Sequence, residues 1–430
     1  TGVDMQREYR RYYPTGEVAA HVVGFTNVDD IGQEGLELAF EDALRGSNGS
    51  KRVIKDRYGQ IIEEVEYIKA PSDGAELVLS LDRRIQFLAY RALKSAVQKH
   101  GALGGSVVVL DSRTGEVLAM ANQPAYNPNN RADRVGARFR NRSVTDVFEP
   151  GSTVKTFTVA SALATGKFKP RSKVDTRPGI LKIGKHKVSD PHDYGVIDVA
   201  TVIKKSSNVG ASKIALALPP EQIWDTFDCV GFGKVTGSGF PGESAGTLSN
   251  YVGWSDFARA TLSFGYGLSV TPLQLAQAYS VIASGGLMYP ITFQKVDAPV
   301  EPERVLAAHA TLQVRAMLEA ATGPGGTGER ARISGYRVAG KTGTVRKSTV
   351  GGYSEDRYLA VFAGMAPASS PRLVAIVTID EPRGKEYYGG QVAAPVFAAV
   401  MAGALRLRGV APDAPTNLDG QVAMVSGNPG

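Results

Sequence analysis

The sequence contains very little cysteine and no long hydrophobic run, and both shortages limit what the protein can be. Cys229 is the only cysteine among 430 residues, which excludes an internal disulfide framework and a zinc site built from several cysteines. No run approaches the roughly 18 consecutive apolar residues of a membrane helix, so we predict that no segment of this sequence spans a membrane. The net charge of +7 suits an anionic surface or polymer, but it is scattered and not interleaved with aromatic residues, so we expect no nucleic-acid partner.

The chain also lacks an initiator methionine and a signal peptide, since it opens with Thr1-Gly2-Val3-Asp4. We therefore expect a trimmed piece of a longer protein. Its length allows two or more domains, and Pro71-Ser72-Asp73-Gly74 is the best candidate boundary. We predict a small mixed region over residues 1–74, a main domain over 75–411 and a poorly ordered tail over 412–430, which is rich in Pro, Asn and Gly.

The hydrophobic periodicity predicts an α+β fold, with an antiparallel sheet flanked by helices and a small mixed amino-terminal region. We predict a hairpin over residues 52–68 with its turn at Tyr58-Gly59, and a polar, mobile loop over residues 346–356. The predicted helices cover residues 33–44, 82–96, 153–163, 272–284 and 394–405. The predicted strands cover residues 76–81, 106–110, 116–120, 336–339, 358–364 and 373–379.

A Ser-x-x-Lys motif opens the predicted helix that follows Pro150-Gly151. A three-residue offset places Ser152 and Lys155 on one helix face, about one turn apart. A serine hydroxyl is a weak nucleophile until a base takes its proton, and a lysine among apolar residues can be neutral enough to do so. A helix cap followed by a surface lysine is the alternative interpretation of this motif alone.

Two further motifs follow in the chain. Lys205 to Gly210 (KSSNVG) contains Ser-x-Asn at Ser206 and Asn208, and Lys341 to Thr344 reads Lys-Thr-Gly-Thr. Ser-x-Asn alone carries little information, because Ser426-Gly427-Asn428 matches it too. In this order the three motifs resemble the signature set of penicillin-binding proteins and serine β-lactamases.

The resemblance extends beyond the motifs to FEPGSTVK, GYGLSVTPLQLAQAY and GKTGT. These segments look like a class B (monofunctional) penicillin-binding protein, and specifically the septal peptidoglycan D,D-transpeptidase of Gram-negative bacteria. The likeness covers residues 15–410. It implies a transpeptidase domain over 75–411 of the penicillin-binding protein and serine β-lactamase type, and it identifies 1–74 as a remnant of the non-catalytic amino-terminal (pedestal) domain.

The resemblance implies a role for each motif residue. Ser152 would attack the carbonyl of the penultimate D-alanine of a stem peptide and form an acyl-enzyme. Lys155 would take the serine proton, Ser206 would pass it to the leaving D-alanine, and Asn208 would hydrogen-bond the substrate amide.

On the predicted strand, Lys341 and the hydroxyls of Thr342 and Thr344 would hold the terminal carboxylate of the substrate. Gly343 would let the strand backbone approach the substrate. The backbone N–H groups of Ser152 and Thr344 would form the oxyanion hole. β-Lactams mimic D-Ala-D-Ala and would acylate Ser152; no metal or organic cofactor is required.

Three aromatic residues are weaker candidates. Tyr387 and Tyr388 look like the aromatic wall beside the site in this family, although ordinary turn aromatics are an equal alternative. Tyr266 in GYG lines the cleft or belongs to the core.

Two rival motifs match by letter alone. Gly335 to Thr342 (GYRVAGKT) fits the P-loop pattern, yet a charged segment precedes it and no helix is expected after it. Gly242 to Gly246 (GESAG) fits the nucleophile elbow of Ser-His-Asp hydrolases, but neither a strand before it nor a helix after it is predicted.

A serine β-lactamase and a D,D-carboxypeptidase stay open as alternatives. No Glu-x-x-x-Asn segment supplies the deacylating base of a β-lactamase, whereas nothing in the residues separates a carboxypeptidase from a transpeptidase. The resemblance implies a location at the periplasmic face of the bacterial inner membrane, held by an anchor that this chain does not include. It also implies membrane proteins of the division machinery as partners.

Overall fold

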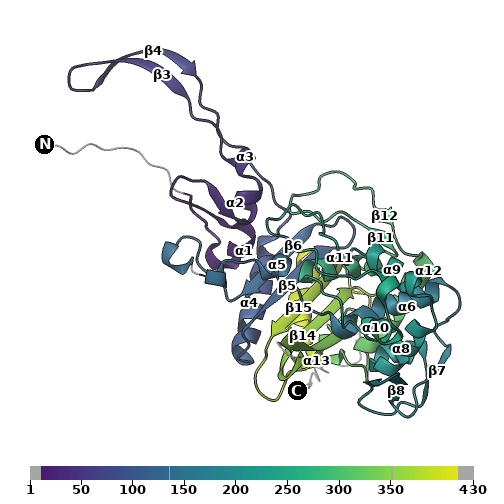
Figure 1. The fold of residues 1–430 in the computed structure, drawn as a ribbon. Helices are drawn as coiled ribbons and strands as arrows, with labels where there is room; N and C mark the ends of the chain where they lie inside the picture. The colour runs from purple at the N-terminus through teal and green to yellow at the C-terminus, as the bar shows by residue number, and fades with distance from the viewer. Residues whose placement is uncertain (1–10, 135, 350–351, 415–430) are drawn as a thin grey trace, which may run out of the picture.

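A five-stranded antiparallel sheet forms the centre of the molecule (Figure 1). The computed structural model describes residues 11–134, 136–349 and 352–414, so residues 415–430 of the predicted tail lie outside the described residues. The strand order is β13-β14-β15-β5-β6, which leaves β13 at one edge. The strands are β5 (Gly104–Asp111), β6 (Val117–Gln123), β13 (Ala339–Thr349), β14 (Gly352–Ala366) and β15 (Leu373–Asp380).

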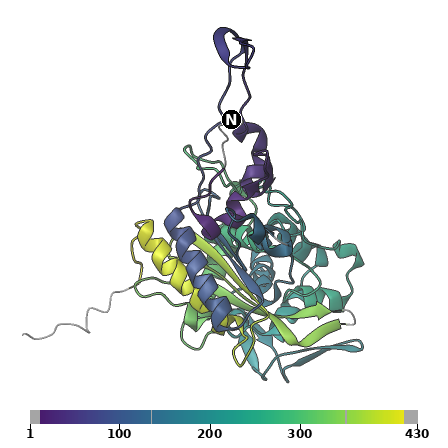
Figure 2. The same ribbon diagram turned by 90° about the vertical axis from the view of Figure 1, so that its left-hand side faces the viewer.

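Helices cover both faces of the sheet. Helices α4 (Arg83–Lys99) and α14 (Ala394–Leu407) lie side by side on one face (Figure 2), and α11 (Pro272–Ala283) packs on the other. Because successive side chains of a strand point to opposite faces, Val107 of β5 joins the α4/α14 core, and Val108 joins the core around α11. The predicted α+β architecture is therefore confirmed.

The Ser-x-x-Lys segment lies in the larger helical layer. The 3-10 helix η4 (Gly151–Val154) leads directly into α6 (Lys155–Ala164), and every residue of Lys155–Leu163 is buried. The predicted helix is confirmed, with a 3-10 first turn. Around it lie α7 (Val199–Lys205), α8 (Asn208–Leu216), α9 (Pro220–Cys229) and α12 (Ala308–Thr322).

The amino-terminal region forms small, separate elements. The predicted hairpin is confirmed as β3 (Ser50–Lys55) and β4 (Ile61–Lys69), which extend far from the body of the molecule (Figure 1). The predicted helix over 33–44 is broken at Phe40, whose φ of −116° and ψ of 22° separate α2 (Gly35–Ala39) from α3 (Glu41–Leu44). The remaining helices of the described residues are η1 Gly16–Val18, α1 Ala20–Val23, η2 Arg131–Asp133, η3 Gly136–Arg138, α5 Arg142–Thr145, η5 Tyr251–Gly253, α10 Asp256–Leu262, η6 Glu329–Ala331 and α13 Gly389–Val392. The remaining strands are β1 Phe25–Thr26, β2 Gly32–Glu34, β7 Lys173–Asp175, β8 Ile180–Ile183, β9 His186–Ser189, β10 Val196–Asp198, β11 Leu287–Met288 and β12 Glu303–Arg304.

Three predictions near these strands were wrong. The segment 76–81 forms a single bridge between Leu79 and Gln294, because its neighbour is a loop and not a strand. The strand predicted over 336–339 begins only at Ala339, since Tyr336 closes a turn with Ile333. Most of the segment 346–356, predicted as a mobile loop, is strand: residues 346–349 extend β13 and residues 352–356 extend β14, since pairing between the strands outweighs the polarity of the sequence, while residues 350–351 lie outside the described residues.

One helical run is long and apolar enough to cross a membrane by length and composition. It covers residues 389–407 with a mean hydropathy of 1.4, and half of it is buried. Because α14 within it packs on α4 and β15, we interpret the run as part of the core of the sheet domain.

Candidate active site

Ser152 is held in a turn whose backbone is fixed from three sides. Gly151 has a φ of +54° and donates its N–H to the carbonyl of Gly265 at 3.1 Å. The hydroxyl of Thr153 bonds the carbonyl of Pro150 at 2.7 Å. Behind the turn, fully buried Tyr279 donates its phenol to the carbonyl of Thr153 at 2.9 Å. Ser152 itself is half-buried, at the point where the chain becomes fully buried.

Lys155 is fully buried and lies beside the Ser-x-Asn motif, as the sequence predicts for a reactive lysine. Its Nζ donates to Asn208 Oδ1 at 2.7 Å and to the carbonyl of Ser206 at 2.6 Å, with Ser206 Oγ at 3.2 Å. Burial lowers the pKa of Lys155 well below 10.5; repulsion by Lys341 lowers it further, and attraction to Asp190 opposes both. Within the described range 136–349, Ser152 Oγ makes no hydrogen bond to Lys155. In enzymes without bound substrate, hydrogen bonds between catalytic groups are often long, and they shorten when the substrate binds.

Ser206 connects the two buried lysines. It ends α7 in the left-handed conformation, with a φ of 60° and ψ of 39°, which is costly for a residue with a side chain. In this position its Oγ accepts hydrogen bonds from Lys155 and, at 2.8 Å, from Lys341 Nζ. The structure therefore brings the three motifs of the sequence into one polar cluster.

Lys341 reaches this cluster from the edge strand β13. Its side chain is fully buried, and burial lowers its pKa from 10.5 to about 7. The neighbouring hydroxyls already have partners: Thr342 donates to Thr327 at 2.9 Å, and Thr344 accepts the N–H of Gly389 at 2.9 Å. Thr344 thus keeps its own proton free for a ligand acceptor.

Gly343 allows a close approach between two parts of the protein, besides the approach of substrate that the sequence predicts. A Cβ atom there would lie 3.2 Å from the carbonyl oxygen of Pro150 and 3.3 Å from a methyl group of Thr153. The missing side chain lets β13 pack against the turn that carries Ser152. This contact sets how far the Lys-Thr-Gly-Thr strand lies from the serine.

The weaker aromatic candidates form two groups beside β13. Tyr387 stacks on Tyr388 and on Tyr358, with ring centroids 4.4 and 4.5 Å apart, and Gly389, which follows them, bonds Thr344. Tyr266 is half-buried and meets Tyr353 edge to face at 5.3 Å.

Two acidic residues of the site were missed by sequence reasoning. Asp190 accepts hydrogen bonds from Ser207 Oγ and from the N–H of Asn208, each at 2.5 Å. Glu149 accepts from the N–H of Gly267 at 2.8 Å and from Tyr353 at 3.0 Å. Glu149 lies within FEPGSTVK and could have been found there, whereas Asp190 is far from any motif.

The rival motifs find no support in the described residues. Lys341 lies on a strand that continues to Thr349, so the helix that a P-loop needs is absent there. The segment 242–246 follows no strand and precedes no helix; the residue after it, Thr247, forms a single bridge with Ser269. Among the described residues, no group of three or more His, Cys, Asp or Glu side chains is placed to hold a metal ion.

Comparisons with known proteins agree with this geometry. The model of the penicillin binding protein transpeptidase domain matches residues 105–402, and the penicillin-binding protein dimerisation domain matches residues 1–79. Peptidoglycan D,D-transpeptidase FtsI of Escherichia coli is 47% identical over 418 residues, which are 97% of this chain and 71% of that protein. The probable peptidoglycan D,D-transpeptidase PenA of Neisseria meningitidis is 44% identical over 412 residues, 95% of this chain and 71% of that protein.

Among solved structures, the transpeptidase domain of Burkholderia pseudomallei penicillin-binding protein 3 is similar, with a TM-score of 0.73 and 41% identity. The match covers 79% of this chain and 98% of that domain. The family model spans all three motifs of the cluster and all of the five-stranded sheet except its first residue, Gly104. The chain therefore belongs to the penicillin-binding protein transpeptidase family.

Proposed function

We propose that this chain is a peptidoglycan D,D-transpeptidase that cross-links stem peptides at the division septum through an acyl-enzyme on Ser152. One observation carries the proposal: a buried lysine one turn after Ser152 shares Ser206 Oγ with a second buried lysine from β13. Two lysines without a carboxylate between them lose protons easily, and a neutral amine beside a serine is what general-base activation requires.

In the acylation step, Lys155 accepts the proton of Ser152 as the serine oxygen attacks the carbonyl carbon of the penultimate D-alanine. The carbonyl oxygen becomes an oxyanion, which the backbone N–H groups of Ser152 and Thr344 stabilise. As the second residue of a 3-10 helix, Ser152 has an N–H without a partner inside the helix. When the peptide bond breaks, Ser206 passes the proton from Lys155 to the departing amine of the terminal D-alanine.

The substrate is held on both sides of the bond that breaks. Asn208 hydrogen-bonds the amide on the acyl side, and its position is set by Asp190. Lys341 and the free proton of Thr344 bind the terminal carboxylate, with Thr342 beside them. Binding of this anion raises the pKa of Lys341, so a proton is taken up with the substrate. Tyr387 and Tyr388 form an aromatic wall past the end of this subsite.

For the whole chain we propose three parts: a remnant of the amino-terminal pedestal domain over 1–74, the transpeptidase domain over 75–411 and a tail over 412–430. Support comes from the dimerisation-domain match and from the change from small elements to one sheet. We place the protein at the periplasmic face of the inner membrane, held by an anchor not included in this chain, with membrane proteins of the division machinery as partners.

Intact mass spectrometry after incubation with benzylpenicillin tests the proposal. We expect a stable adduct of one penicillin on the wild-type chain and none on Ser152→Ala. An adduct that persists in Ser152→Ala would contradict the nucleophile assignment. Rapid loss of the adduct would favour a β-lactamase, and release of D-alanine without cross-linked product in the presence of an acceptor peptide would favour a D,D-carboxypeptidase.

A further inference from the structure

A cavity of about 400 Å³ lies at the end of the sheet where β5 turns into β6 and β14 turns into β15. The end of α11 and one side of α12 complete its walls. No residue of the three motifs lines it. Lys341 pairs across the ladder with Ala363, whereas the turn that borders the cavity starts only after Ala366. The cavity is therefore separate from the catalytic cluster.

Two arginines without a carboxylate partner line this cavity. Arg113 donates to Ser370 Oγ at 3.0 Å, and Arg315 donates to the carbonyl of Ser369 at 3.2 Å. Among the described residues, neither guanidinium makes another hydrogen bond or an ion pair. A guanidinium carries more N–H donors than one such bond uses, so both side chains keep donors for a ligand.

Two carboxylates close to the cavity are already engaged, and neither lines it. Glu319 accepts two hydrogen bonds from Arg337, at 2.6 and 2.7 Å, and Asp413 accepts the N–H and the hydroxyl of Ser369. Burial and then repulsion by Arg337 lower the pKa of Arg315, and attraction to Glu319 opposes both. Because an arginine keeps its charge in spite of such a shift, the cavity contains positive charge that its own lining does not neutralise.

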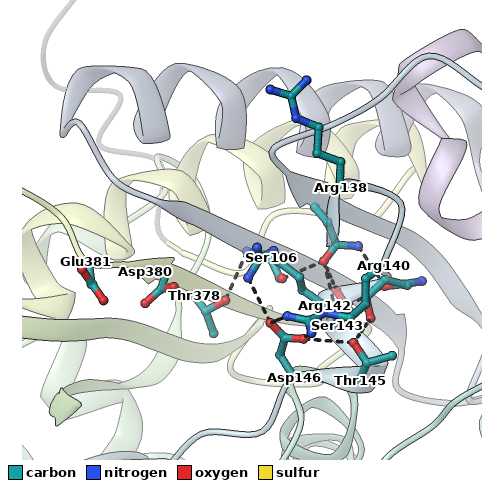
Figure 3. A network of polar contacts seen from close by, with 12 residues as sticks. Ser106, Arg138, Arg140, Arg142, Ser143, Thr145, Asp146, Thr378, Asp380 and Glu381 are labelled. Atoms are coloured by element: carbon teal, nitrogen blue, oxygen red, sulfur yellow. Dashed lines mark hydrogen bonds and ion pairs between the residues drawn. The ribbon is translucent and has the colours of Figure 1, made fainter. Parts of the chain in front are cut away.

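Arginines elsewhere in the same domain show the usual arrangement. Arg140 and Arg142 both point to Asp146 in Figure 3, at 2.9 and 3.0 Å. Their charge is balanced within the chain. Arg113 and Arg315 differ in this respect, so a bound anion would supply the partner that they lack.

The remaining lining residues indicate what carries the anion. Ser370 Oγ accepts from Arg113 and keeps its own proton, and the phenol of Tyr289 has no hydrogen-bond partner among the described residues. The rest of the wall includes apolar Ala283, Leu312 and Pro371, and Leu312 is 48% exposed. Free donors beside apolar surface suit a carboxylate on a small apolar skeleton, whereas a lone inorganic anion would leave the apolar wall unused.

We propose that this cavity binds the terminal carboxylate of a second, uncross-linked stem peptide, which ends in D-Ala-D-Ala. The carboxylate accepts hydrogen bonds from Arg113 and Arg315, and the alanine methyl groups lie against Leu312 and Pro371. This choice of occupant rests on the proposed function, whose substrate is a polymer with many identical peptide ends. A second contact with the same polymer raises the effective concentration of the other ends near Ser152.

Binding of short peptides to the benzylpenicillin-acylated chain tests the proposal, because acylation occupies the catalytic cluster. The probes are N-acetyl-D-Ala-D-Ala, its carboxamide and N-acetyl-L-Ala-L-Ala, each titrated by ligand-observed NMR. We expect the D,D acid to bind about ten-fold more tightly than its amide, as is typical of a charge-assisted hydrogen bond. Equal binding of acid and amide would overturn the inference. An L,L acid that binds as tightly as the D,D acid, or inorganic phosphate that does so, would refute the stem peptide as occupant.

Arg113→Gln and Arg315→Gln should each lower the affinity for the D,D acid about ten-fold and leave that for the amide unchanged. Arg140→Gln is the matched control, because it removes the same charge from a residue that pairs with Asp146 and does not line the cavity. It should bind the D,D acid as wild type does. Unchanged affinity in both cavity variants, or an equal loss in Arg140→Gln, would contradict the proposal. Acylation by benzylpenicillin at the wild-type rate shows that each variant is folded.

The same acylation separates this inference from the proposed function. A normal penicillin adduct, together with equal binding of acid and amide, would reject the cavity proposal alone. Absence of the adduct on Ser152 would reject the proposed function. The two arginine variants would then still report whether the cavity takes a carboxylate.

Discussion

Replacing Lys341 by methionine should change how the stability of this protein depends on pH. Lys341 is fully buried, and its recorded partners are Ser206 Oγ at 2.8 Å and the carbonyl of Thr342 at 3.3 Å. Neither partner carries a charge, so nothing compensates the lost hydration of an ammonium group. Methionine has similar length, packs in apolar surroundings and does not titrate.

The magnitude follows from the pKa of Lys341. Burial lowers this pKa to about 7 in the folded chain, while the unfolded chain keeps the ordinary 10.5. Between these two values the unfolded state binds more protons, so the free energy of unfolding rises with pH. The full difference corresponds to on the order of 5 kcal/mol, and the part between pH 7 and about 9.5 to roughly 3 kcal/mol. Lys341→Met should lack this contribution.

Urea unfolding of wild type and Lys341→Met at several pH values between 7 and 9.5 measures the difference. The wild type should gain stability relative to the variant as the pH rises, whereas Lys205→Met, at an exposed lysine beside Ser206, should parallel wild type. Titrating groups remote from Lys341 cancel in the comparison of each variant with wild type, whereas loss of the Lys341 charge raises the pKa of Lys155 and so changes the difference in the same direction. A difference between Lys341→Met and wild type that does not change with pH would refute the reasoning, because it would mean that Lys341 keeps its proton on folding.

Two further predictions concern the groups that position the site. Asp190→Asn removes one of the two carboxylate oxygens that hold Ser207 and Asn208, so acylation by benzylpenicillin should slow about ten- to hundred-fold. Loss of the Asp190 charge should also lower the pKa of Lys155 further, and the acidic limb of the pH–rate profile should move to lower pH; an unchanged limb would contradict this electrostatic link. Gly343→Ala places a Cβ 3.2 Å from the carbonyl oxygen of Pro150, so β13 must move by a few tenths of an ångström. Stopped-flow acylation should show a slower Gly343→Ala variant with a melting temperature within a few degrees of wild type, and an unchanged rate would show that this spacing is not critical.

Elements with strong local signals were predicted well from the sequence. Helix α11 begins at Pro272 and ends at Ala283, close to the predicted bounds, because Thr271 and Gln274 form a capping box at its start. Helix α4 begins after Asp82, whose carboxylate caps the N–H of Arg84 as expected. In both helices the local residues already satisfy the free backbone groups, so the boundaries are visible without the rest of the chain.

Elements that depend on a distant partner were predicted poorly. The polar residues of the β13–β14 hairpin, including Arg346 and Ser348, are typical of a loop in the sequence. In the structure, however, Arg346 pairs with Tyr358 and Ser348 pairs with Tyr353. Tyr336 was predicted to lie in a strand because it is apolar, but it lies in a turn. Strand formation depends on the neighbour across the ladder, and the composition of one segment does not reveal that neighbour.

The sequence by itself determined which residues form the candidate site, because Ser152, Lys155, Ser206, Asn208 and Lys341 lie in motifs whose order is informative. Only the tertiary structure decided how their charges behave. A lysine has an ordinary pKa in water, and both lysines of the site differ because helices and a sheet edge exclude water around them. The structure alone also revealed Asp190 and the cavity lined by Arg113 and Arg315, since both arise where segments distant in the chain meet.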